Sequence, residues 1–151
     1  MVTRNTKALL TVNEGQYRTK ILEFEKECYS IQKPLHILEK SCLRFGATLA
    51  GRRRAAASLL GTNNMLPAPV KPLYGLYMFP IASDKNEHNI WLSYYAIKHC
   101  VSLGKYAMIH FNDDSTLEVH VSARIIDNQR KKTAQVIAGM AYQLFLNPDE
   151  G

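Results

Sequence analysis

The sequence predicts an α+β domain: a mainly antiparallel sheet of roughly five to seven strands, carrying a basic helix-loop-helix pair and a long C-terminal helix. Short runs of alternating or aromatic residues, typical of strands, stand on both sides of a stretch with helical spacing. A second helical stretch closes the chain. The 151 residues, 46% of them hydrophobic, suffice for one core. We therefore treat residues 1–151 as a single domain.

The chain is expected to begin with strands. Lys7 to Val12 has the pattern of a strand, and Asn13 to Gln16 is a plausible turn into a second one. From Ile21 to Cys28 the residues alternate, with Leu22 and Phe24 on one face and three glutamates on the other, which predicts one half-exposed strand. Because glutamates repel DNA, we expect this face to be solvated and turned away from it.

Two helices are predicted between residues 33 and 61. Pro34 suits a first helical position, and apolar residues recur at helical spacing up to Phe45, which predicts a helix over residues 34–45. Good helix formers fill residues 52–60 and predict a second helix, after a short loop over residues 47–51.

Prolines and aromatic residues divide the middle of the chain. Thr62 to Pro72 contains three prolines, which remove backbone donors, and is expected to be an extended, packed loop. Leu73 to Phe79 and Ile90 to Ile97 are rich in aromatic and aliphatic residues and predict two strands. The aromatic side chains of the second strand could stack on bases, but in strands such residues more often belong to the core.

The clearest local signal is a hairpin over Tyr106 to Val121, whose two alternating runs are joined by turn residues 112–115. Ser122 can cap a following helix, in which apolar residues recur at helical spacing as far as Asn147-Pro148.

Positive charge is concentrated in two patches. The chain carries a net charge of +6, residues 33–61 carry +5 and residues 124–132 carry +3, so the remainder is negative. Clustered positive charge is typical of proteins that bind polyanions. On the C-terminal helix Arg124 and Lys131 share one side and are free to meet phosphate, whereas Arg130 falls within the apolar stripe.

Three consecutive arginines, Arg52, Arg53 and Arg54, stand at the predicted start of the second helix, where the helix dipole disfavours cations. With flexible Gly51 and the free backbone N–H groups, they suggest a phosphate cradle. The alternative is a solvated basic helix end, paired with acids elsewhere. The spacing from Gly46 matches a nucleotide-binding P-loop poorly, because the loop follows a helix and lacks the lysine-serine/threonine pair.

Other chemistry finds no support in the sequence. The five histidines and the three cysteines have no metal-ligand spacing, and no activated nucleophile is evident, so we expect neither metal, cofactor nor enzymatic activity. His110 and His120 flank the hairpin turn and could face each other across it, as surface or cross-strand residues. An odd number of cysteines, no membrane-spanning run and no signal peptide indicate a cytoplasmic protein without disulfides.

The sequence resembles the ComK family of competence transcription factors. Four segments carry the likeness, in the family's order: residues 33–61, Tyr77 to Pro80, Asn89 to Ser93, and Thr116 to Gln129. The resemblance implies a DNA-binding activator of competence (DNA-uptake) genes. Such a protein would be nucleoid-associated and would bind paired AT-rich boxes as a homo-oligomer, largely through the minor groove.

This target agrees with the charge pattern, since the narrow minor groove of AT-rich DNA attracts arginines. We expect one or more of the three consecutive arginines to enter the groove and other cations to grip phosphates. The candidate DNA-binding residues are Arg52, Arg53, Arg54, Gly51, Lys40, Arg44, Arg124, Arg130, Lys131 and Lys132.

Family members commonly continue beyond the final helix with a further basic segment, so the chain resembles a C-terminally short member. RNA polymerase and a Clp-protease adaptor are the further partners that the resemblance implies. A short relative could also be a non-activating, DNA-binding competitor of a full-length one. A basic interaction module for an acidic protein or a membrane is the alternative from another class. An RNA binder is disfavoured because no RNP-type or GXXG signature is present.

Overall fold

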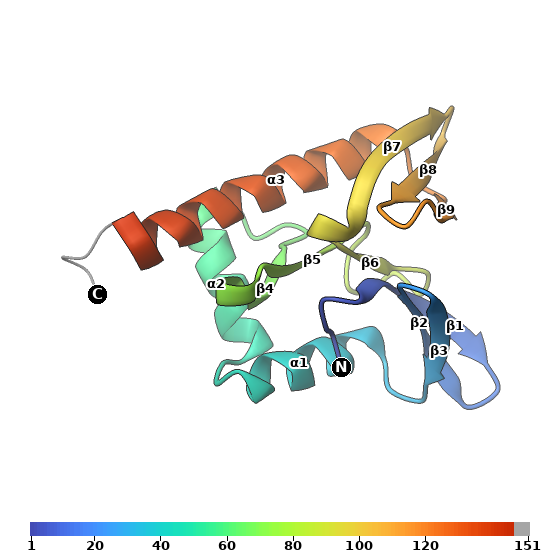
Figure 1. The fold of residues 1–151 in the computed structure, drawn as a ribbon, viewed down its shortest axis with the longest axis horizontal. Coiled ribbons are helices and arrows are strands. Elements are labelled where there is room, and N and C mark those ends of the chain that lie inside the picture. The colour runs from blue at the N-terminus through green and yellow to red at the C-terminus, as the bar shows by residue number, and fades with distance from the viewer. Residues whose placement is uncertain (147–151) are drawn as a thin grey trace.

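Two antiparallel sheets and three α-helices form the fold, in a computed structural model that describes residues 1–146 (Figure 1). The strands are β1 (Thr6–Glu14), β2 (Tyr17–Glu23), β3 (Lys26–Ser30), β4 (Ala68–Lys71), β5 (Leu76–Pro80), β6 (Ile90–Ser93), β7 (Ile97–Leu103), β8 (Tyr106–Phe111) and β9 (Thr116–Val119). The helices are α1 (Pro34–Arg44), α2 (Leu49–Leu60) and α3 (Ala123–Ala141), and α3 continues as a π-helical turn over Tyr142–Leu146.

The strands are divided between a six-stranded sheet, in the order β3-β2-β1-β6-β5-β4, and a three-stranded sheet, in the order β7-β8-β9. The predicted α+β class with antiparallel pairing is confirmed. The six strands of the larger sheet fall within the expected range of five to seven, but the expectation of a single sheet is wrong, because three further strands form a second one. The chain changes sheet after β6, where a 3₁₀ turn over Tyr94–Ala96 redirects what the sequence suggested was one strand.

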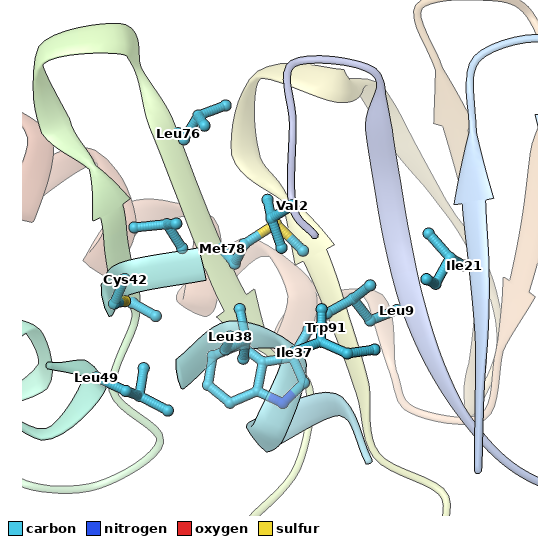
Figure 2. Packing of buried hydrophobic residues seen from close by; sticks show 12 residues of the cluster. Val2, Leu9, Ile21, Ile37, Leu38, Cys42, Leu49, Leu76, Met78 and Trp91 are labelled. Carbon is cyan, nitrogen blue, oxygen red and sulfur yellow. The ribbon is translucent and has the colours of Figure 1, made fainter. Parts of the chain in front are cut away.

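The central strands of the larger sheet are buried on both faces. On one face Leu9, Met78 and Trp91 pack against α1, as Figure 2 shows. On the other face their neighbours Phe79 and Leu92 pack toward the smaller sheet and α3. Burial on both sides explains why these strands contain continuous apolar residues instead of a clean alternation. It also confirms that Trp91 is a core residue.

The predicted strand from Ile21 to Cys28 is wrong. The segment is a tight hairpin: β2 ends at Glu23, the backbone turns at Glu25 with φ +70°, and β3 returns beside β2. Ile21 and Cys28 are cross-strand partners and face α1, whereas Phe24 faces the smaller sheet. A left-handed turn at a glutamate has no strong sequence signal, because non-glycine residues rarely adopt it.

The proline-rich connector is only partly a loop. Ala68–Lys71 forms β4, which pairs with β5 at the edge of the larger sheet and accommodates Pro69 there. The next predicted strand begins later than expected, since Pro72–Tyr74 is a 3₁₀ turn and β5 starts at Leu76.

The C-terminal elements agree better with the sequence. The β8-β9 hairpin is confirmed, and Ser122 accepts a hydrogen bond of 3.4 Å from the Ile125 N–H at the start of α3. The predicted end of this helix at Asn147-Pro148 lies outside the described residues. His110 does not face His120: it stacks on His99 of β7, with ring centroids 4.4 Å apart.

A buried lysine joins the two sheets. The Nζ of Lys7 in β1 lies 2.9 Å from Oδ2 of Asp113 and donates to Oγ of Ser115 at 2.7 Å, in the turn between β8 and β9. Burial raises the pKa of Asp113, but hydrogen bonds from Ser115 and Lys7 outweigh it and bring that pKa down to about 2. Lys7 is therefore a cation committed to the fold.

The three helices are linked through α2, which runs from the end of α1 to α3 (Figure 1). Ala56 of α2 packs with Val136 and Met140 of α3. The helices approach closely at Gly139, where an added Cβ would lie 2.7 Å from a methyl group of Leu59. All ten predicted DNA-binding residues lie on these three connected helices.

Candidate nucleic-acid interface

The exposed face of α1 carries cations and no acid. Its opposite face packs on the larger sheet, which leaves Lys40 and Arg44 exposed, with Lys33 exposed just before the helix. The helix has one acid, Glu39, and its Oε2 accepts a hydrogen bond of 2.9 Å from the Leu49 N–H of α2. Because Glu39 is engaged in this way, its carboxylate is not arranged to pair with the exposed cations.

The structure corrects the start of the second helix. α2 begins at Leu49, three residues before Arg52, and Thr48 caps it by accepting a hydrogen bond of 2.9 Å from the Gly51 N–H. Two N-terminal N–H groups are thus bonded within the protein, and the arginines lie beyond the first turn, where the helix dipole is weak. The arrangement on which the predicted phosphate cradle rested, free N–H groups directly beside the three arginines, is therefore not the one observed.

Gly51 is explained by this cap. A Cβ at this position would lie 2.9 Å from Oγ1 of Thr48, which is closer than real Cβ contacts allow. Glycine therefore permits the threonine hydroxyl to reach the helix end.

The three consecutive arginines have different surroundings. Arg53 makes two hydrogen bonds to Asp84, of 2.9 and 3.0 Å, and its guanidinium carbon lies 5.6 Å from the ring centroid of Trp91. Arg52 is half-buried, and its buried Nε has no hydrogen-bond partner among the described residues. Arg54 is exposed and makes no ion pair with a carboxylate of residues 1–146. Arg54 is the member of the trio most available to a ligand.

The charge of Arg52 is not balanced by the ionisable groups beneath it. Burial raises the pKa of the Cys42 thiol to about 11 and that of the Tyr77 hydroxyl to about 12, and Arg52 partly opposes both rises. Both groups are therefore neutral near pH 7. Cys42 is fully buried and belongs to the core between α1 and the larger sheet.

The exposed side of α3 carries mixed charge. Arg124 and Lys131 are both exposed, in agreement with their predicted common side, and neither pairs with a described carboxylate. Asp127, one turn from each, is exposed as well and reduces the local positive charge. Arg130 is half-buried, in agreement with its place near the apolar stripe.

Lys132 binds the protein's own backbone. Its Nζ donates to the carbonyl oxygens of Asn64, at 2.6 Å, and Met65, at 3.1 Å, and burial lowers its pKa. Gln129, one turn earlier, donates to the Met65 and Pro80 carbonyls, each at 2.9 Å. These contacts hold the segment after α2 against α3, so Lys132 has a structural role.

The fold also brings two further cations, Arg4 and Lys71, next to Arg44 at the end of α1. Both lie against the ring of Tyr74. They are isolated in the sequence, at positions far from either basic patch, and no local pattern could have revealed them.

Within residues 1–146, no group of three histidine, cysteine or acidic side chains is arranged to hold a metal ion. In the same range, no helix combines the length and the apolar character that crossing a bilayer requires.

Comparison with known proteins identifies the family. The family model described as ComK protein matches residues 1–144. The competence transcription factor of Bacillus subtilis is 27% identical over 122 residues, which are 80% of this chain and 64% of that relative. The chain thus spans somewhat less than two thirds of the relative's length, and no solved structure matches it. Because the family model covers nearly all of its length, the chain belongs to the ComK family.

Proposed function

We propose that the protein is a DNA-binding transcription factor that activates competence genes. Membership of the ComK family and the similarity to the competence transcription factor of Bacillus subtilis support this assignment. The observations that carry the DNA contact are the exposed, acid-free basic face of α1 and the exposure of Arg54 on α2. A surface that carries only positive charge attracts a polyanion, and the mutual repulsion of its cations costs free energy when no anion is bound.

The proposed target is AT-rich duplex DNA, contacted largely through its minor groove. This groove is narrow and strongly negative in A-tracts, and an inserted arginine can read its width. Arg54 is the best placed of the three arginines to enter it, because Arg53 is held by Asp84 and Arg52 is half-buried. Phosphate contacts come from the exposed cations Lys40, Arg44, Arg124 and Lys131.

In this proposal the protein acts in the cytoplasm, on the nucleoid, as a homo-oligomer that occupies paired boxes. Cooperation with RNA polymerase follows from the activator role. The chemistry needed is recognition only, so the proposal includes no enzymatic step.

Fluorescence anisotropy with labelled duplexes tests the proposal. An AT-rich and a GC-rich duplex of equal length are titrated at several salt concentrations. We expect tighter binding to the AT-rich duplex and a log-log salt slope of about −5, the value for roughly six neutralised phosphates. Lys98→Gln is the control, because Lys98 lies in β7 and pairs with Asp114. A slope near zero without AT preference would instead favour a protein-docking surface.

A further inference from the structure

A basic groove with aromatic walls lies where the N-terminal segment, the end of α1 and the end of β4 meet. It is a cavity of about 660 Å³ lined by nine residues, of which three are cations and none is an acid. The cations are Arg4, Arg44 and Lys71, and the aromatic residues are Phe45 and Tyr74.

The rings hold the cations in place. The Lys71 ammonium lies 3.4 Å from the ring centroid of Tyr74 and 4.0 Å from that of Phe45, and the Arg4 guanidinium carbon lies 5.2 Å from the Tyr74 centroid. Cation-π contacts attract a positive charge without neutralising it. Arg4 and Lys71 thus share one ring, and their mutual repulsion is not relieved by any carboxylate of the groove.

This geometry favours an anion over a stacked base. Arg4 and Lys71 already lie over the aromatic rings, whereas no cation of the groove has an acidic partner among the described residues. Phosphate oxygens match such donors well, because charge-assisted hydrogen bonds to phosphate are strong.

The groove is continuous with the proposed DNA surface. Arg44 belongs to both, since it lies on the exposed face of α1 and also lines the groove. A polymeric anion lying along α1 can therefore reach Arg4 and Lys71, whereas a small anion would occupy the groove alone.

We infer that Arg4 and Lys71 bind the sugar-phosphate backbone of duplex DNA and extend the phosphate track of α1 across the β4-β5 edge of the larger sheet. This inference rests on the proposed function and deepens it. Phosphate contacts carry no base information, so the groove should strengthen binding to every duplex equally.

The double variant Arg4→Gln with Lys71→Met tests the inference. It removes two charges, so the salt slope should become less steep by about two, and affinity at moderate salt should fall on the order of tenfold for both duplexes. The ratio of AT-rich to GC-rich affinity should not change. The matched control is Lys98→Gln with Lys105→Gln, which removes the same charge near β7 and should leave the slope nearly as it was.

The outcomes separate the two proposals. If the wild type binds AT-rich DNA and the double variant behaves like its control, the groove assignment is overturned and the proposed function stands. If the wild type binds no duplex, both are overturned. A changed AT/GC ratio would contradict a backbone contact. Should the double variant unfold, Arg4→Gln alone, at an exposed position, should still reduce the slope by about one, and no change there would overturn the inference.

Discussion

The two basic patches look alike in sequence but differ in how their cations are used. In the first, α1 exposes Lys40 and Arg44, and its acid Glu39 is bonded to the backbone of α2. In the second, Lys132 is bonded to backbone carbonyls and Asp127 shares the exposed face with the remaining cations. A count of charges overstates both patches, because it cannot distinguish a cation open to a ligand from one committed to the fold. Lys132 is such a committed cation in the second patch, and Arg53, held by Asp84, is one in the first.

Charge removal on each patch is the strongest test of this difference. Replacing Lys40, Arg44 and Arg54 together with Gln should weaken binding to AT-rich DNA on the order of 100-fold at moderate salt and make the salt slope less steep by about three. Replacing Arg124 and Lys131 with Gln should reduce the slope by clearly less than about one per charge removed, because exposed Asp127 already offsets part of their charge. Anisotropy titrations measure both. Equal losses per charge removed would show that the two patches are equivalent after all.

The Lys7–Asp113 pair extends the comparison to a cation whose role is structural, since Lys7 is paired within the fold. Lys7→Met should lower the free energy of unfolding at pH 7 by roughly 2 kcal/mol, less than for a fully buried pair because 24% of the Asp113 side chain is exposed. DNA binding by the folded fraction should be unchanged. Urea denaturation followed by circular dichroism measures the loss.

The same pair predicts an acid dependence. The effect of burial is outweighed by hydrogen bonds from Ser115 and from Lys7, which lower the pKa of Asp113 from 3.8 to about 2 in the folded protein, so this stabilisation is present above pH 4 and is lost as the pH falls through 2. The difference in stability between wild type and Lys7→Met should therefore shrink across that window. A difference that stays constant down to pH 2 would assign the effect to packing.

Two neighbouring lysines give the sharpest contrast within one helix. Lys132→Gln should lower the free energy of unfolding by about 1 kcal/mol, since it disturbs two hydrogen bonds to backbone carbonyls, with little change in the salt slope of DNA binding. Lys131→Gln should do the reverse, leaving stability within about 0.5 kcal/mol and reducing the slope by about one. If Lys132→Gln and Lys131→Gln give the same free energy of unfolding and the same salt slope, the structural role assigned to Lys132 is wrong.

The smallest effect is expected at the start of α2. Gly51→Ala places a Cβ against the Thr48 hydroxyl and should lower the free energy of unfolding by about 1 kcal/mol or less, the range for a lost N-cap. Thr48→Ala should cause a similar loss, and the double variant should add little to either. Gly51→Ala and Thr48→Ala should each keep the affinity of the wild type for DNA. A strong loss of binding with stability intact would restore a direct phosphate role for Gly51.

The sequence predicts elements whose signals are local. The β8-β9 hairpin has a turn rich in asparagine and aspartate, and Ser122 is a strong capping residue, so both were foreseeable. The predicted start of α2 at residue 52 is three residues too late, because the helix is capped by Thr48 and begins at Leu49. The split of the Ile21–Cys28 segment depends on one glutamate in a left-handed turn.

The site was less predictable because its properties come from contacts between distant residues. The Arg53–Asp84 pair and the bonds from Lys132 to Asn64 join positions that no local pattern relates. Arg4 and Lys71 are likewise far apart in the sequence, and only the fold brings them together. Sequence can therefore locate the basic segments, but the choice among their cations requires the fold.

Under the proposed function, the bond from Glu39 to the first turn of α2 has a consequence for discrimination between DNA sequences. It fastens the two helices to each other, so the separation between Arg54 and the cations of α1 is a property of the backbone. A duplex whose groove width does not match this separation would have to deform to contact Arg54 and the α1 cations at the same time. The free-energy cost of that deformation differs between stiff and flexible DNA sequences. The Glu39 carboxylate, without itself contacting DNA, would thereby fix the spacing of cations that a duplex must match.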